Sequence, residues 1–230
     1  TKNCGKIRNM NTLESVLMFL APNDCLYCNQ EGRLVCENCW NEIIETVPSR
    51  CYVCKKSTKH YQTCPSCRKK TPLKRVYVVT TYNKKVKKLV HAMKLGSNRE
   101  AASIVASYLD ENAPYYESTI VNVPTVPAHY RERGFDHSKN IAKSFARCRD
   151  LKYKQSLIKH NSSKQVGKSK ADRLTQVKNV FEYKEKLNSK NPILLIDDVV
   201  TTGASLTEAA KTIKKAGAKD IEGLVFAQTV

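Results

Sequence analysis

The stretch that decides the fold is Pro192-Ile193-Leu194-Leu195-Ile196-Asp197-Asp198-Val199-Val200-Thr201-Thr202-Gly203-Ala204-Ser205. Its continuous apolar run is typical of a strand that is buried on both faces, as in a parallel sheet. The residues from Ser205 to Ala216 then have helical periodicity. A buried strand, a polar turn and a helix form the repeating unit of open α/β sheets, which bind ligands at the carboxyl ends of their strands.

The same alternation extends outward from this unit through most of the chain. Further β-branched runs cover residues 76–82, 119–126 and 221–229, and segments with helical period cover residues 84–95, 101–112 and 138–151. Strands that alternate with helices predict parallel pairing, because each crossover helix returns the chain to the same edge. We therefore predict an α/β domain over residues 76–230, with a mostly parallel sheet and flanking helices.

The turn after the central strand has the composition of an anion site. Gly203 permits a close backbone approach to a ligand, and Thr201, Thr202 and Ser205 offer hydroxyl groups beside the free amides of a helix N-terminus. Ser205 and Glu208 have capping-box spacing, which predicts that Ser205 caps the helix. A phosphate fits this loop.

The acidic pair narrows the class of ligand. Asp197 and Asp198 stand directly before the loop, where they would repel a bare polyphosphate, but they could accept hydrogen bonds from sugar hydroxyls and help to hold Mg²⁺. A phosphorylated ribose that carries pyrophosphate satisfies both requirements. The plainer alternative is that the two acids only end a strand and the loop is only a turn. Walker and dinucleotide-binding glycine motifs are absent from the sequence.

Eight cysteines near the N-terminus indicate two structural Zn²⁺ sites. They form four Cys-x-x-Cys pairs, which are Cys25/Cys28, Cys36/Cys39, Cys51/Cys54 and Cys64/Cys67. The short intervals favour consecutive pairing of the first two and the last two pairs, although a cross-braced arrangement is also open. This spacing suits thiolate ligands in a reducing compartment and predicts a cytoplasmic protein. We expect residues 1–75 to form a helix and a double zinc-ribbon module.

The charge of the chain is strongly positive. Forty Lys and Arg residues against 21 Asp and Glu residues give a formal charge of +19. Basic clusters at 68–75, 84–88 and 147–190 could contact a nucleic-acid backbone, although such runs are more often solvated faces. No apolar run approaches the roughly 20 residues of a membrane-spanning helix, so we expect no membrane insertion.

Several motifs together resemble one family. The strand, acidic pair and Thr-Thr-Gly loop resemble the phosphoribosyl pyrophosphate (PRPP) signature of type I phosphoribosyltransferases. The whole chain is similar to the ComF (ComFC) family of competence-associated, phosphoribosyltransferase-like proteins. The supporting motifs are Leu17–Pro22 before the cysteine pairs, Lys94-Leu95-Gly96, Arg131-Glu132-Arg133-Gly134-Phe135, and the spaced Gln165, Arg173 and Asn179. Asp136 and His137 depart from the family, which usually has Asn and Gln there.

The resemblance implies roles for individual residues. The loop residues would hold the 5′-phosphate, the acidic pair would engage the ribose hydroxyls and the Mg²⁺ shell, and three basic residues would neutralise pyrophosphate. The loop residues are Thr201, Thr202, Gly203, Ala204 and Ser205, and the basic residues are Lys94, Arg131 and Arg133.

Three functions are compatible with these observations. The first is a PRPP-binding, zinc-containing cytoplasmic protein that handles incoming single-stranded DNA during natural transformation, in contact with other DNA-uptake proteins. The second is an active phosphoribosyltransferase that joins PRPP to a nitrogenous acceptor through an oxocarbenium-like state, with catalysis by positioning and charge stabilisation. The third is a scaffold whose pocket binds no ligand.

Overall fold

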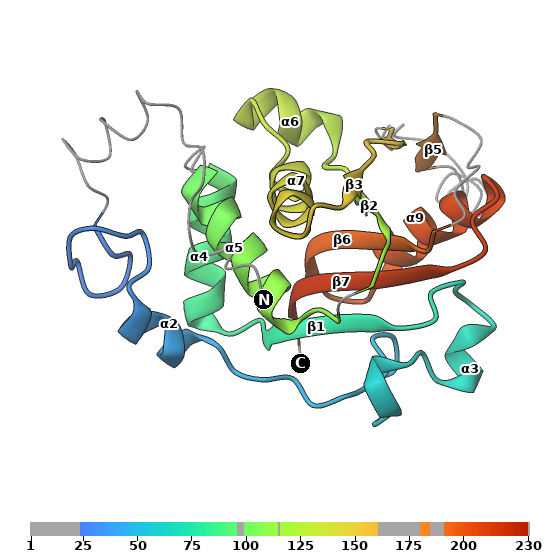
Figure 1. The fold of residues 1–230 in the computed structure, drawn as a ribbon, viewed down its shortest axis with the longest axis horizontal. Helices are drawn as coiled ribbons and strands as arrows, with labels where there is room; N and C mark the ends of the chain where they lie inside the picture. The colour runs from blue at the N-terminus through green and yellow to red at the C-terminus, as the bar shows by residue number, and fades with distance from the viewer. Residues whose placement is uncertain (1–23, 96–98, 115, 161–179, 185–190, 230) are drawn as a thin grey trace, which may run out of the picture.

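The fold is organised around strand β6 (Ile193–Val200), which lies in the middle of the sheet (Figure 1). The computed structural model describes residues 24–95, 99–114, 116–160, 180–184 and 191–229. Every β6 residue except Val199 is buried, including both acids. A strand that is enclosed on both faces must be apolar up to its last residues, which explains the unbroken Ile-Leu-Leu-Ile run.

Five strands form a fully parallel sheet around this strand. Their order is β1 (Val76–Thr81), β7 (Ile221–Gln228), β6, β2 (Thr119–Asn122) and β3 (Lys152–Tyr153). The predicted mostly parallel sheet is therefore confirmed. Strand β2 ends four residues earlier than we predicted, because Pro124 has no N–H group to donate to a neighbouring strand.

One face of the sheet is covered by three helices, α4 (Lys84–Leu95), α5 (Arg99–Asn112) and α7 (His137–Arg149). Leu194 and Ile196 belong to the hydrophobic core on this side. The buried positions of α7 recur at helical spacing, so the apolar stripe that the sequence predicts is the stripe that packs.

The other face is covered by α9 (Ala204–Lys215) and by a two-stranded antiparallel ribbon, β4 (Leu157–Lys159) and β5 (Phe181–Tyr183). Ile193 and Leu195 belong to this second core, so alternate residues of β6 serve opposite faces. The short helix α6 (Pro127–Arg133) and the ribbon were not predicted, because segments this short carry little periodic signal. Within the described ranges, every helix is too short or too polar to cross a membrane.

The N-terminal segment runs along the outer side of β1 (Figure 1). It contains α2 (Glu37–Ile43), a 3₁₀ turn η1 (Lys59–Tyr61) and α3 (Pro65–Arg68). Isolated antiparallel bridges join Thr46 to Thr80 and Gln62 to Arg75. The segment therefore pairs with an edge strand that would otherwise present free backbone groups.

Side chains of this segment also enter the hydrophobic core. Trp40, on α2, is 4% exposed, and its ring centroid lies 6.4 Å from that of Phe226 in β7. The core is thus shared across residue 75. The division into residues 1–75 and 76–230 stays a prediction.

We expect Trp40→Ala to lower the free energy of unfolding by about 3–5 kcal/mol, because it removes a large buried ring from the shared core. The exposed Asn41→Ala on the same helix is the matched control and should change the free energy by less than about 0.5 kcal/mol. Thermal denaturation of the zinc-loaded protein measures both effects. Equal melting temperatures for the two variants would contradict this packing.

Candidate functional site

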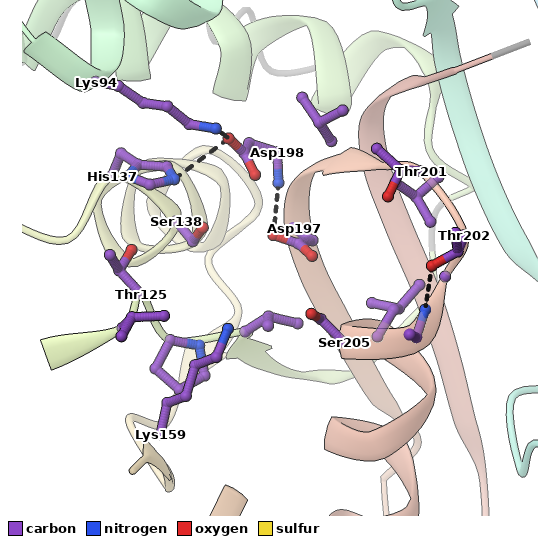
Figure 2. A pocket seen from close by; sticks show the side chains of 18 residues that line it. Lys94, Thr125, His137, Ser138, Lys159, Asp197, Asp198, Thr201, Thr202 and Ser205 are labelled. Carbon is purple, nitrogen blue, oxygen red and sulfur yellow. Dashed lines mark hydrogen bonds and ion pairs between the residues drawn. The ribbon is translucent and has the colours of Figure 1, made fainter. Parts of the chain in front are cut away.

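A pocket of about 290 Å³ opens at the carboxyl ends of β6 and β2. Figure 2 shows its polar side chains converging from β6, the loop before α9, the start of α7, the end of α4 and strand β4. The labelled polar residues are Lys94, Thr125, His137, Ser138, Lys159, Asp197, Asp198, Thr201, Thr202 and Ser205. This is the edge at which open α/β sheets bind ligands.

Asp198 is held as an anion by two basic side chains. Its Oδ2 atom lies 2.7 Å from Lys94 Nζ and 3.2 Å from His137 Nε2, and the residue is 6% exposed. Burial alone would raise the pKa of this carboxyl. The contact with His137 and the charge of Lys94 outweigh burial and hold the pKa of Asp198 below its ordinary value.

The pKa of Asp197 is shifted in the opposite direction. It is 9% exposed, and its Oδ1 atom accepts a hydrogen bond from the Asp198 N–H at 3.0 Å. Burial and then the negative charge of Asp198 raise the pKa of Asp197 well above its ordinary value. The pocket therefore contains one carboxyl group whose pKa is lowered and one whose pKa is raised. Such separation is a common property of functional acid pairs.

The loop after β6 leaves helix amides free for an anion. Helix α9 begins at Ala204 with Gly203 as its N-cap in the left-handed conformation, at φ 76°, and no side chain caps the helix. The predicted capping role of Ser205 is therefore wrong, since this residue already lies inside the helix. First-turn N–H groups have no intrahelical acceptor, so an uncapped start is a ready anion site.

The hydroxyl groups of this loop line the pocket as predicted. Thr201, Thr202 and Ser205 are exposed, whereas Gly203 is buried beneath them. The Ala204 N–H donates to Thr202 Oγ1 at 3.4 Å, which orients the turn. Ala204 itself also lines the pocket, so the structure brings together all five predicted loop residues.

The three predicted pyrophosphate-binding cations are placed differently. Lys94 lines the pocket and pairs with Asp198, whereas Arg131 is exposed on α6 and does not belong to the described lining. The backbone of Arg133 is in α6, but its side chain is outside the described atoms, as are Gly96, Gln165, Arg173 and Asn179. The pyrophosphate roles of Lys94, Arg131 and Arg133 stay predictions.

Two ionisable side chains of the pocket were not among the predicted site residues. His137, 5% exposed at the start of α7, pairs with Asp198, and Lys159 enters from β4. Burial lowers the pKa of Lys159 despite the carboxylates nearby. His137 could have been found from its place after the Gly134-Phe135 motif, whereas no local signal marks Lys159.

Asp136, which stands where the family that the sequence resembles usually has Asn, also has a defined geometry. Asp136 is the N-cap of α7, and its Oδ1 atom accepts a hydrogen bond from the Lys139 N–H at 3.1 Å. Its two carboxylate oxygens also accept from the N–H and the hydroxyl of Thr125. A carboxylate therefore anchors the segment after β2 to α7 at the rim of the pocket, and His137 follows in the position that reaches Asp198.

The eight cysteines form two tetrads of consecutive pairs, which are Cys25, Cys28, Cys36 and Cys39, and Cys51, Cys54, Cys64 and Cys67. Within each tetrad, all sulfur atoms lie within 4.8 Å of one another. The closest recorded contacts are 3.6 Å from Cys28 to Cys36 and 3.5 Å from Cys54 to Cys64. Zn–S bonds of about 2.3 Å in a tetrahedron place sulfurs about 3.8 Å apart, so each tetrad fits one structural Zn²⁺.

The two acids should have opposite effects on stability. Because the pKa of Asp197 is raised in the folded protein, its ionisation destabilises the fold as pH rises above the ordinary value toward the folded value. Asp197→Asn should therefore raise the melting temperature at pH 8 by about 2–4 °C. The gain should shrink as pH falls, because the wild-type acid becomes protonated.

Asp198→Asn is the matched variant and should lower the melting temperature by at least a few degrees, since it leaves Lys94 and His137 without their anion. The lowered pKa of Asp198 gives stability that is present above its ordinary pKa and is lost only as pH falls toward the folded value. Differential scanning fluorimetry of zinc-loaded protein between pH 5.5 and 8.5 compares both variants. Shifts of the same sign would contradict the separated acid pair.

No family model matches the chain, but several curated proteins are similar to it along most of its length. Competence protein ComFC from Streptococcus pneumoniae is 27% identical over 222 residues, which cover 95% of each chain. Competence protein F from Haemophilus influenzae is 23% identical over 216 residues, with coverage of 86% of this chain and 93% of the relative. The DNA utilization protein YhgH from Escherichia coli is 23% identical over 206 residues, with 78% and 90% coverage.

Two solved structures resemble parts of the chain. The allosteric regulatory enzyme of purine biosynthesis matches 55% of this chain with a TM-score of 0.43 and 17% identity, and the match spans only 25% of that enzyme. A purine phosphoribosyltransferase from Pyrococcus horikoshii matches 66% of this chain and 77% of its own, with a TM-score of 0.31 and 17% identity. The chain is thus similar along nearly its whole length to proteins named ComFC or competence protein F, and it combines paired Cys₄ clusters with a parallel sheet.

Proposed function

We propose that the pocket binds a phosphorylated ribose, with PRPP and Mg²⁺ as the preferred ligand, and that the protein handles incoming single-stranded DNA in the cytoplasm during natural transformation. The observation that carries the sugar-binding part is the direct succession of a buried acid pair and an uncapped helix start in one cavity. Each half of this arrangement suits a different part of the same ligand.

The loop suits the 5′-phosphate. Its exposed Thr201, Thr202 and Ser205 hydroxyls can donate to phosphate oxygens, and the free amides at the start of α9 add the positive end of the helix dipole. Gly203 supplies the left-handed backbone conformation that this turn needs just before the first helical residue.

The acid pair suits the ribose and its metal. Asp198 is a fixed acceptor for a sugar hydroxyl, and carboxylate oxygens of this kind are the ligands that Mg²⁺ prefers. Mg²⁺ would favour the ionised form of Asp197, so binding should release the proton that this acid holds. Lys94 and Lys159 face the same cavity and would offset the charge of a pyrophosphate group.

The alternative function is transfer of the phosphoribosyl group from PRPP to a nitrogenous acceptor. In that reaction the bond between the anomeric carbon and pyrophosphate breaks, the acceptor nitrogen forms the new bond, and pyrophosphate leaves with its electron pair. His137 is already engaged with Asp198, and no other described lining residue is placed as a dedicated general base. Rate enhancement would therefore come from positioning and charge stabilisation.

Isothermal titration with PRPP and Mg²⁺ tests the sugar-binding proposal. Asp198→Asn should weaken binding at least about tenfold, because a charge-assisted hydrogen bond is lost in a buried site. Glu208→Gln, on the outer side of α9 where Glu208 pairs with Lys211, is the control and should leave the affinity unchanged. Wild-type protein that does not bind PRPP, or binds it as well with Asn at 198, would refute the assignment.

Two observations favour the DNA-handling part. Relatives along most of the chain are named as competence or DNA utilization proteins. Arg68, Lys69 and Lys70 are exposed at the end of α3, and in the described part of the chain no acidic group forms an ion pair with them.

Lys74 and Arg75 are instead paired with Asp220 and Glu222, so the predicted 68–75 cluster contributes mainly its first three charges. Much of the basic segment 147–190 lies outside the described residues.

Anisotropy of a labelled single-stranded oligonucleotide at several salt concentrations tests this surface. Replacing Arg68, Lys69 and Lys70 together by Gln should reduce the slope of log affinity against log salt by about 2, if all three contact phosphates. Lys74→Gln is the control, because its charge is already neutralised by Asp220, and it should change the slope by much less. Affinity that is independent of salt, or equal slopes for the triple variant and wild type, would contradict a phosphate contact.

A further inference from the structure

A tyrosine of the second cysteine cluster reaches the floor of the anion-binding loop. Tyr52 stands between Cys51 and Cys54, yet its side chain is 0% exposed and belongs to the core beneath α9. A short metal-binding knuckle thus inserts one large ring into the core of the sheet domain.

The ring lies directly against Gly203. A Cβ atom placed on Gly203 would be 2.7 Å from Tyr52 Cε2 and 2.9 Å from Tyr52 Cδ2, closer than side-chain carbons approach in proteins. The absence of a side chain at Gly203 therefore has two reasons, its left-handed φ of 76° and the ring beneath it. The ring therefore limits how closely the loop can pack against the core.

The hydroxyl group of Tyr52 ties the same loop to the cysteine segment. It donates to Thr71 Oγ1 at 2.8 Å and shares a 2.7 Å hydrogen bond with Thr207 Oγ1. The Thr207 N–H in turn donates to Gly203 O at 2.9 Å, which closes the first turn of α9. The Tyr52 hydroxyl therefore links the segment that follows Cys67 to the first turn of α9, which faces the pocket.

The backbone of the knuckle is fixed on its other side by β7 and the residue after it. Gln228 Nε2 donates to Tyr52 O at 3.1 Å, Arg50 Nε donates to Gln228 Oε1 at 2.9 Å, and Lys55 Nζ donates to Thr229 O at 3.0 Å. Tyr52 is thus held between the sheet and the flanking ligands Cys51 and Cys54. Without a metal bound to Cys51 and Cys54, Tyr52 would be held only by its contacts with the sheet.

We propose that Tyr52 is a positioning residue that couples metal occupancy of the Cys51–Cys54–Cys64–Cys67 cluster to the geometry of the anion-binding loop. The affinity for the phosphate end of the ligand then depends on the metal in this cluster and not on the metal in the other one. The ligand part of the inference rests on the proposed phosphoribose binding, whereas the structural coupling does not. By linkage, a bound ligand must strengthen metal binding by the same factor.

The first cluster provides the contrast. Tyr27 stands just before Cys28 and is half-buried, and its hydroxyl donates to Lys85 O of α4 at 2.7 Å. Its ring packs against the other core, with α4 and α5, and has no contact with the loop among the described residues. Tyr27 is therefore a matched control that has the same residue type beside a cysteine ligand.

Amide hydrogen exchange over residues 201–207 tests the coupling without any ligand. Tyr52→Phe, which keeps the ring but removes both hydroxyl contacts, should speed exchange about fivefold, as expected for loss of about one net hydrogen bond. Tyr52→Leu should speed it at least about tenfold, and Tyr27→Phe and Tyr27→Leu should leave it unchanged. Far-UV circular dichroism and zinc content verify that each variant is folded and loaded.

A second arm removes the metals separately. Replacing Cys51 and Cys54 by Ser should expose the amides of 201–207 and weaken Mg²⁺–PRPP binding, whereas replacing Cys25 and Cys28 by Ser should do neither. In wild type, Mg²⁺–PRPP should slow zinc transfer from the second cluster to a chromogenic chelator, and Tyr52→Phe should remove at least half of that effect.

The outcomes separate the two proposals. Faster loop exchange in the Tyr52 variants together with no PRPP binding by wild type would sustain the coupling and refute the proposed ligand. PRPP binding with loop exchange that is unaffected by Tyr52 substitution and by loss of the second metal would refute the coupling alone. Equal effects from the Tyr27 and Tyr52 variants would also overturn it, because the coupling would then be general destabilisation.

Discussion

Two adjacent carboxylates buried at the end of the central strand are the constraint on which the rest of the site depends. Neither Asp197 nor Asp198 could remain there as an isolated anion, because removing a charge from water is strongly unfavourable. The chain meets this constraint in two ways: Lys94 and His137 balance one acid, and burial raises the pKa of the other, which favours its protonated form. Helices α4 and α7 must therefore bring their polar ends to the same edge of the sheet.

That arrangement explains why the pocket is polar although the strands around it are apolar. The apolar side chains on both faces of β6 pack in the two cores, whereas the acids at its carboxyl end line the pocket. Different residues of one strand therefore serve stability and ligand binding. Asp197 is an exception, because its ionisation opposes folding. Retention of a group that the fold disfavours is expected where function needs it.

The architecture could be predicted from sequence because its signals are long and repetitive. The apolar run of β6 and the helical stripes of α4, α7 and α9 each extend over eight or more residues, and the observed bounds differ by only a few residues. The acid pair and loop could be predicted because they are contiguous, and the cysteine tetrads because their spacing is regular.

Contacts between distant segments could not be predicted in the same way. Lys159 enters the pocket from a three-residue strand, and Tyr52 meets Gly203 across about 150 residues of chain. Ser205 was assigned to the cap because its spacing to Glu208 is favourable locally. The close approach of Tyr52 and the left-handed backbone of Gly203 instead place the cap two residues earlier, at Gly203. Tertiary packing decided each of these positions.

The pairing of the N-terminal segment with β1 has a consequence for solubility. Thr46 and Gln62 occupy backbone groups along a strand whose outer edge would otherwise be open to another chain. Thr46 lies between the two cysteine tetrads and Gln62 lies within the second one, so metal depletion would loosen the cover at both bridges. A cell short of zinc would then hold molecules with an exposed, β-branched edge, which is the usual starting point for intermolecular strand addition and aggregation.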